Sequence, residues 1–340
     1  MVKPYTFENA YSVTMFSFTN ELLQAQHSPA ELAGTLLASG VTKNLEFDGP
    51  QFFRNFGQVG AELTSDTAAV DQLRAKYGSG ISLLGGYVDR AIGPGQLQSS
   101  DAVLASVTEQ LKLANRIGAR GMRMMVDALT LDELRALAPI ARDQDVRILF
   151  ELQGSMTPEA ETTRKCLDTV AALDTEYVGV MFDSSLFMRC FPPSFKALLT
   201  RLGVTTAMLA QLEKDWLTLN PGQLRGKLVA AIDSGDLPGS LHAVLPTIVG
   251  RMGHGSPADW AAVAPQIQSV QLKYWDNDDT AAAVSGPTLE LMQLLAGVGY
   301  SGHYCSEWGG HEWHSLTQQS SLDSVRAHRA LVEACFHQAH

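Results

Sequence analysis

Short apolar runs alternate with amphipathic segments along most of this chain. The amphipathic segments carry apolar residues at helical spacing, and several begin at a capping residue such as Ser28 or end at a glycine such as Gly118. Repeated strand–helix alternation predicts a parallel sheet, and eight such units predict closure into an α/β fold of the (β/α)₈ TIM-barrel type. The strand-like runs cover residues 10–18, 43–49, 81–89, 120–127, 146–152, 177–183, 269–275 and 302–308.

The alternation is interrupted after the sixth strand-like run. The long stretch between Asp183 and the seventh run carries apolar residues at helical spacing. A structureless loop of this length is uncommon in a compact domain, so we expect a helical insertion at about residues 190–255. A chain of 340 residues fits one barrel with an insertion better than two equal domains, which predicts a single TIM-barrel domain over residues 1–340.

The composition argues against several classes of partner. The net charge is −11 and no block of basic residues offsets it, so we expect neither nucleic acid nor an anionic membrane as a partner. No apolar stretch approaches the roughly 18 residues of a membrane span, and the first residues lack the apolar centre of a signal peptide. The four cysteines lie far apart and are expected to be reduced thiols. We therefore expect a cytoplasmic protein.

Four late strand-like runs end in an oxygen-bearing side chain: Glu151, Asp183, Gln271 and Glu307. Any one of them alone is more commonly a helix cap or the partner of an arginine. Because the C-terminal ends of barrel strands converge on one face, however, the four side chains should meet there. Carboxylate and amide oxygens form a hard donor set. We expect them to bind a divalent metal, Mn²⁺ first, with Mg²⁺ or Co²⁺ as alternatives.

At these four residues the chain resembles the xylose-isomerase-like barrel superfamily of sugar isomerases and epimerases. The longer pattern of FDSSLFMRCFPP, MGHGSPADW, VQLKYWD and GYSGHYCSEWGGHEW resembles a branch that contains the catalytic barrel subunit of C-glycoside deglycosidases. This resemblance implies a carbohydrate-active enzyme for 3-oxo-glycosides that pairs with a smaller β-rich subunit. We also expect the chain to be oligomeric. A bound metal would stabilise the enediolate formed when a proton α to a carbonyl is removed.

Three functions stay open at this point. In a lyase, a base removes the C2 proton of a 3-oxo-glycoside and the aglycone leaves C1 by β-elimination. In a sugar isomerase or epimerase, the same enediolate is reprotonated. In the third hypothesis, the chain is a non-catalytic barrel subunit of a larger complex. Two departures keep the third open, because Gln153 and Leu186 stand where relatives carry histidines.

Three side chains are candidates for the proton transfer. His254, in the insertion, is expected over the barrel mouth, although it could equally fix its own loop. His311 follows Glu307 closely, whereas His314 is expected at the surface. Lys273 shares a strand face with Gln271 by the period of two. Lys273 could hold a substrate oxyanion, act as a base with a lowered pKa, or form an ion pair with Glu307 or Asp183.

Four further residues are candidates for substrate binding. Phe187 and Arg189 follow Asp183 and are expected to line an apolar pocket, with packing of the insertion onto the barrel as the alternative for Phe187. Trp308 and Trp313 lie in or beside a polar loop after the last strand. Aromatic rings in such a place suit stacking on a sugar or an aromatic aglycone.

Overall fold

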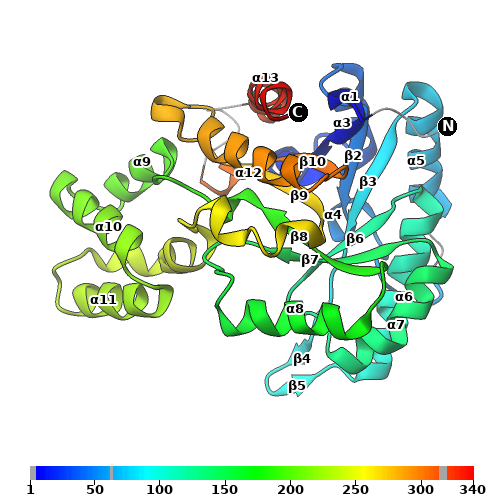
Figure 1. Ribbon diagram of the computed structural model, residues 1–340, viewed down its shortest axis with the longest axis horizontal. Helices are drawn as coiled ribbons and strands as arrows, with labels where there is room; N and C mark the ends of the chain where they lie inside the picture. The colour runs from blue at the N-terminus through cyan, green and yellow to red at the C-terminus, as the bar shows by residue number, and fades with distance from the viewer. Residues whose placement is uncertain (1–4, 62–63, 314–319) are drawn as a thin grey trace.

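Eight parallel strands close into a barrel in the computed structural model, which describes residues 5–61, 64–313 and 320–340 (Figure 1). The order around the barrel is β1-β10-β9-β8-β7-β6-β3-β2, so the predicted (β/α)₈ fold is confirmed. His314 lies outside the described residues. The barrel strands are β1 (Tyr11–Thr14), β2 (Asn44–Asp48), β3 (Gly80–Gly85), β6 (Gly121–Met125), β7 (Arg147–Leu152), β8 (Val178–Asp183), β9 (Ile267–Tyr274) and β10 (His303–Trp308).

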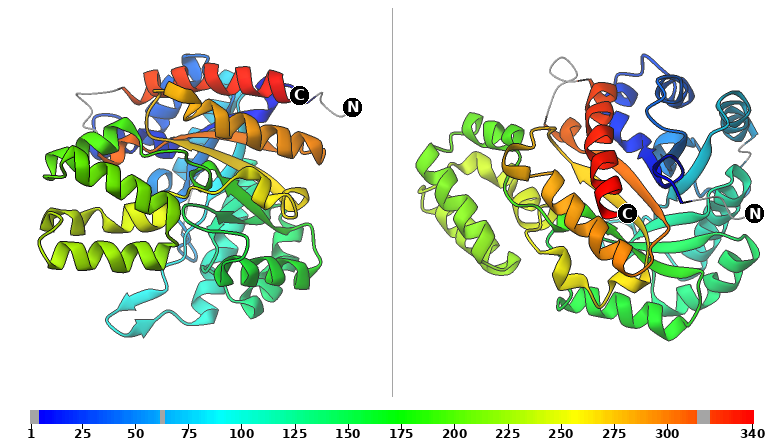
Figure 2. Two further views of the ribbon diagram at one scale, coloured as in Figure 1. Left: turned by 60° about the vertical axis from the view of Figure 1, so that its left-hand side comes forward. Right: turned by 45° about the horizontal axis from the view of Figure 1, so that its top comes forward.

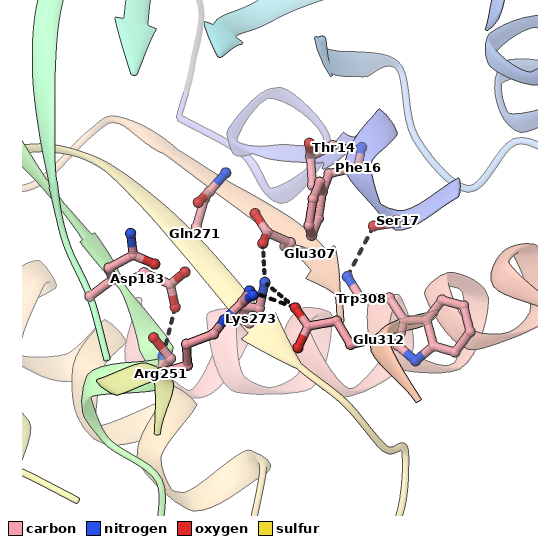
Figure 3. Close-up of polar contacts among 12 residues, drawn as sticks. Thr14, Phe16, Ser17, Asp183, Arg251, Gln271, Lys273, Glu307, Trp308 and Glu312 are labelled. Carbon is pink, nitrogen blue, oxygen red and sulfur yellow. Dashed lines mark hydrogen bonds and ion pairs between the residues drawn. The ribbon is translucent and has the colours of Figure 1, made fainter. Parts of the chain in front are cut away.

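The first strand is shorter than its apolar run predicts. β1 ends at Thr14, whose side chain accepts a hydrogen bond from the Phe16 amide, and Met15–Phe18 then form a 3₁₀ turn. A threonine hydroxyl that bonds an amide two residues on favours a turn over continued strand pairing. The turn brings Phe16 to the barrel mouth (Figure 3).

Helices surround the barrel and pack on the outward faces of its strands (Figures 1 and 2). Ser28 and Thr130 each begin a helix with a capping box, and Gly118 ends α6 with φ of 81°. The longer helices are α3 (Pro29–Ala38), α5 (Thr64–Tyr77), α6 (Ser100–Ile117), α7 (Leu131–Asp143), α8 (Glu161–Leu173), α12 (Ser285–Gly297) and α13 (Ser321–Ala339), and the shorter ones are α1 (Phe7–Ala10), α2 (Thr19–Leu23) and α4 (Gly49–Phe52).

A helical segment follows the sixth barrel strand, β8, in the stretch where the sequence predicts a helical insertion at about residues 190–255. It contains α9 (Pro193–Arg201), α10 (Thr206–Thr218) and α11 (Pro221–Asp233), which stand beside the barrel (Figures 1 and 2). These helices share an apolar cluster of their own, with Trp216 and Phe195 among its buried members. The chain returns to β9 through a π-helical turn at Thr247–Arg251 and a 3₁₀ turn at Pro257–Trp260.

A small hairpin projects from the loop after β3. Its strands, β4 (Ala91–Gly93) and β5 (Gln96–Leu97), pair antiparallel, and Ile92 and Leu97 are largely exposed. The sequence pattern predicts no helix or strand at these residues. None of the helices described by the structure is both long and apolar enough to cross a membrane.

Candidate active site at the barrel mouth

The four predicted metal ligands lie on four neighbouring strands and are all buried. Glu151 is on β7, Asp183 ends β8, Gln271 is on β9 and Glu307 is on β10. Asp183 stands opposite Gln271 in the β8–β9 register, and Glu307 stands opposite Lys273 in the β9–β10 register. Asp183, Gln271 and Glu307 are seen together in Figure 3. The structure therefore brings the strand-end residues to one end of the barrel.

The barrel floor below them is apolar. Leu149 and Met181 precede Glu151 and Asp183 by two residues, so each pair shares one strand face. Together with Leu83 they form a small buried cluster separate from the main core. Water is therefore kept from the lower side of the carboxylates, which strengthens the electrostatic interactions among them.

Arg123 of β6 joins three carboxylates at this end of the barrel. Its Nε lies 3.1 Å from Glu46 Oε1, its Nη1 lies 3.1 Å from Glu151 Oε2, and its Nη2 lies 3.8 Å from Asp48 Oδ1. Burial alone disfavours the charge, but Glu151, Glu46 and Asp48 raise the pKa of Arg123 well above its ordinary value. The guanidinium is a fixed cation within the site.

Lys273 forms a buried ion pair with Glu307, and its Nζ lies 3.8 Å from Glu312 Oε1 (Figure 3). The ammonium also lies 4.8 Å from the centre of the Phe16 ring. Burial alone would lower the pKa of Lys273, but Glu307, Glu312 and Asp183 outweigh it and raise that pKa. The ion pair expected as an alternative is therefore present. The hypothesis of a lysine base with a lowered pKa is wrong.

The carboxyl groups have unequal proton affinities. Burial raises the pKa of Glu46 to about 7 and also raises the pKa of Glu151, although Arg123 opposes both shifts. Burial, followed by repulsion from Glu151 and Glu307, raises the pKa of Asp183 well above its ordinary value. Burial has the same tendency at Glu307, but Lys273 and Arg123 outweigh it and lower the pKa of that carboxyl. Such divergence is typical of sites that handle protons.

The donor set and the charge balance of this site fit a hard divalent cation. Three negative charges are unbalanced if all groups are ionised, and Gln271 Oε1 is buried without a hydrogen-bond partner in the described chain. Within residues 5–61, 64–313 and 320–340, no three acidic, histidine or cysteine side chains are arranged so that they could hold a metal ion as they stand. Arg123 pairs with Glu151 and Lys273 pairs with Glu307. The acidic groups in this balance are Glu46, Asp48, Glu151, Asp183, Glu307 and Glu312, and the cations are Arg123, Lys273 and Arg251.

His311 lies at the mouth, where its ring packs edge-on against Phe16 at 4.7 Å between centroids. Burial, and then the charge of Lys273, lower the pKa of His311 to about 4. The imidazole is therefore neutral at neutral pH. Its buried Nδ1 has no hydrogen-bond partner within the described residues.

His254 lies elsewhere. Its ring is exposed and stands 5.3 Å from the Trp216 ring, on the wall of a 640 Å³ cleft that also includes Met156 and Asn220. None of the four strand-end residues lines that cleft. The residue of the insertion that lies at the mouth is instead Arg251, which pairs with Glu312 (Figure 3). The expectation that His254 stands over the mouth is therefore wrong.

Among the predicted substrate-binding residues, Trp308 requires correction. It is fully buried, its backbone amide donates to Ser17 Oγ at 2.9 Å, and its indole donates to the Trp275 carbonyl at 2.9 Å. Successive strand residues point to opposite faces, so a β10 that directs Glu307 inward directs Trp308 outward. Trp308 is a packing residue.

The other three candidates divide between core, outer surface and mouth. Phe187 is buried and packs edge-on against Phe182, the alternative predicted for it, and it also lines a small pocket with Met188, as predicted. Arg189 pairs with Glu290 of α12, and both side chains are about half exposed. Trp313 stacks on Trp275 at 5.9 Å and its indole donates to Ser194 Oγ, and Lys273 Nζ lies 5.6 Å from the Trp275 ring. Of these candidates, Trp313 is the one close to the charged site.

The sequence pattern did not single out Glu46, Asp48, Arg123 or Arg251 as site residues. Glu46 and Asp48 were within reach of prediction, since they alternate with apolar residues in KNLEFDG and therefore share one strand face. Nothing local marks Arg123 or Arg251 as partners of distant carboxylates.

Comparison with known proteins gives relatives in sequence and in fold. No family model matches the chain. It is 22% identical over 333 residues to a C-glycoside deglycosidase alpha subunit of Arthrobacter globiformis, covering 96% of this chain and 92% of the relative. It is also 22% identical over 338 residues to a 3'-dehydrocarminate deglycosidase alpha subunit of Microbacterium sp., covering 95% and 94%.

Solved structures with the same fold include sugar epimerases. A D-psicose 3-epimerase matches with a TM-score of 0.56 at 9% identity, covering 96% of this chain and 99% of that one. A xylose-isomerase-like TIM-barrel protein from Mycobacterium smegmatis, in complex with magnesium, matches with a TM-score of 0.51 at 12% identity, covering 99% of each. The predicted resemblance is confirmed: the chain is similar over nearly its full length to deglycosidase alpha subunits, and its fold is that of the xylose-isomerase-like barrels.

Proposed function

We propose that the chain is a sugar-processing enzyme that removes a proton α to a carbonyl of a 3-oxo-glycoside and releases the aglycone. The observation that carries this proposal is the group of buried carboxylates, amide and lysine at the barrel mouth. Similarity to deglycosidase alpha subunits over nearly the whole chain supports the choice of substrate class.

The proposal includes a divalent metal held by Glu151, Asp183, Gln271 and Glu307, with Mn²⁺ first and Mg²⁺ or Co²⁺ as alternatives. Three carboxylates and an amide oxygen are suitable ligands for such an ion, and magnesium is bound by one barrel of the same fold. When bound, the metal would polarise the substrate carbonyl and stabilise the enediolate.

The chain's own residues supply the remaining steps. Lys273, held as a cation by Glu307 and Glu312, is placed to bind the oxygen on which negative charge develops. His311 is neutral and lies at the mouth, which makes it our candidate for the base that takes the C2 proton. The C2–H electrons first form a C2=C3 bond while the C3 carbonyl electrons move onto its oxygen. That oxygen then re-forms the carbonyl as the C1=C2 bond forms and the C1–aglycone bond breaks. The aglycone leaves with the electron pair of that broken bond and takes up a proton, which protonated His311 can return. Trp275 and Trp313 offer stacked rings beside this position.

We propose in addition that the active form contains a partner subunit, because the relatives are named alpha subunits. Activity should therefore be measured on the chain alone and on the chain mixed with a candidate smaller subunit. A mixture that elutes as one larger species and turns over faster than either component would support this part of the proposal. Two separate species with unchanged turnover would contradict it.

The direct test follows release of free aglycone from a 3-oxo-glycoside by chromatography. A chelator should abolish release and Mn²⁺ should restore it. Glu307→Gln should lower turnover by at least about 100-fold, because it removes both a proposed ligand and the charge that holds Lys273. Glu109→Gln is the matched control, since Glu109 pairs with Lys112 on the outer face of α6.

The products separate the alternatives. A rearranged sugar with no free aglycone would contradict the lyase and indicate an isomerase or epimerase, the activity named for the D-psicose 3-epimerase of the same fold. No turnover with either kind of substrate, with and without the partner, would indicate a non-catalytic barrel subunit. Turnover unaffected by chelation would contradict the metal.

A further inference from the structure

Gln271 is held by a carboxylate that is not itself one of the proposed ligands. Gln271 Nε2 donates to Oε1 of Glu46 on β2 at 2.8 Å, and both side chains are fully buried. β2 and β9 are not neighbours in the barrel order, so this hydrogen bond crosses the barrel interior. It fixes the rotation of an amide group that would otherwise have a broad, nearly two-fold torsional preference.

The chemistry of Glu46 determines which end of the amide faces it. Glu46 Oε1 also accepts a hydrogen bond from Arg123 Nε at 3.1 Å, so this oxygen serves two donors. An oxygen that accepts twice in this way must face the NH₂ group of Gln271 and not its carbonyl. Gln271 Oε1 therefore points the other way, where it is buried without a hydrogen-bond partner among the described residues.

We propose that Glu46 is a positioning residue that aims Gln271 Oε1 into the proposed metal site. The inference rests on the proposed metal. It explains how a glutamine can act as a ligand, although rotation of its amide could otherwise turn either the oxygen or the NH₂ group towards the metal. A carboxylate that holds the NH of a metal-binding histidine performs the same task in many metal sites. Arg123 completes the arrangement, because one guanidinium holds both Glu46 and Glu151.

The test is a double-mutant cycle read by calorimetric titration of the apoprotein with Mn²⁺. Glu46→Leu removes the acceptor, so Gln271 must bind the metal with its buried NH₂ left unpaired. We expect Mn²⁺ affinity to fall by about 10- to 100-fold. In a Gln271→Ala background the same Glu46→Leu change should alter the affinity by less than about twofold, because Glu46 then has no amide to orient.

A second variant covers the case in which Glu46→Leu does not fold, since Arg123 would lose a buried partner. Glu46→Gln keeps the size and an acceptor oxygen, and should weaken Mn²⁺ binding by about three- to tenfold with Gln271 present. The loss should again disappear in the Gln271→Ala background. Circular dichroism of each variant identifies those that are folded.

The outcomes separate this inference from the proposed function. Absence of Mn²⁺ binding by the unmodified chain would overturn the metal site itself. Binding that is abolished by Glu307→Gln but unchanged in both Glu46 variants would leave the metal site standing and overturn the positioning role. An equal loss with and without Gln271 would also overturn it, because Glu46 would then act by another route.

Discussion

Among the four strand-end side chains, Gln271 differs most in chemistry from the rest. The other three are carboxylates, whereas an amide oxygen carries no charge and coordinates more weakly. Its burial and its hydrogen bond to Glu46 give it a fixed direction that charge does not supply. On the proposed function, this one residue should therefore control which metals the site prefers.

Gln271→His should raise affinity for Mn²⁺ and Co²⁺ by about tenfold or more while leaving Mg²⁺ affinity unchanged or lower. Imidazole nitrogen suits transition metals, whereas Mg²⁺ prefers oxygen. The histidine can still donate its second ring nitrogen to Glu46. Calorimetric titration with each of the three metals measures the effect. An equal rise for Mg²⁺ would show that the gain does not come from nitrogen ligation.

Several site residues were predictable because their sequence context alone is distinctive. Glu151, Asp183 and Glu307 each close an apolar run, and the alternation of runs identifies the barrel whose strand ends converge. The period of two also assigns Lys273 to the face of Gln271, and it could have placed Trp308 on the opposite face from Glu307. These inferences need only the geometry of one strand.

Other features depend on contacts between distant segments. Arg123 reads as an exposed charge in a strand-like run, and its burial follows from Glu46 and Glu151 on other strands. His254 was misplaced because the path of the insertion is set by packing on Trp216, and Trp216 Nε1 donates to the Met252 carbonyl at 2.9 Å. Spacing along the chain does not encode such a path.

Two interactions of Glu133 hold the N-terminus of helix α7: a capping box and an ion pair. Thr130 and Glu133 form its capping box, and Glu133 also pairs with Arg90 at the base of the β4–β5 hairpin. The Arg90 hydrogen bond lowers the pKa of Glu133 to about 2, against an ordinary value of 4.5, although burial opposes the shift. The ion pair thus joins the hairpin loop to the helical layer.

Glu133→Gln should lower the free energy of unfolding at pH 7 by about 1–3 kcal/mol. Because the folded-state pKa is depressed, this stability is present above about pH 4.5 and is lost as the pH falls towards 2. Melting temperatures of the two proteins should therefore approach each other across that window. Glu109→Gln, at an exposed pair, should show little difference at any pH. A gap between Glu133→Gln and the unmodified chain that stays constant from pH 7 to pH 3 would contradict the assignment.

The part of the chain that the structure describes contains two main apolar clusters. One fills the layer between the barrel strands and the surrounding helices, and the other lies within the helices that follow β8. Leu137 is a buried member of the first and Leu228 of the second. Apolar cores that are separate in this way can lose structure separately.

Leu228→Ala should destabilise the chain by about 2–5 kcal/mol, as for other buried leucines. The faster amide hydrogen exchange should be concentrated in residues 193–251, with the barrel strands protected as before. Leu137→Ala is the matched substitution in the barrel layer and should loosen the strands instead. Hydrogen exchange followed by mass spectrometry distinguishes the two patterns. Equal loosening of both regions by either change would indicate one cooperative unit.

Arg123 and Lys273 give the mouth its own counter-ions before any metal arrives. The buried acids are therefore partly neutralised within the chain itself, and on the proposed function we expect the chain to fold without its metal. On the proposed function, loading then becomes an exchange reaction in which the incoming ion competes with two tethered cations for Glu151 and Glu307. The strength of metal binding is set by that competition as much as by the ligands, and an apoprotein prepared with chelator should remain folded and ready to be reloaded.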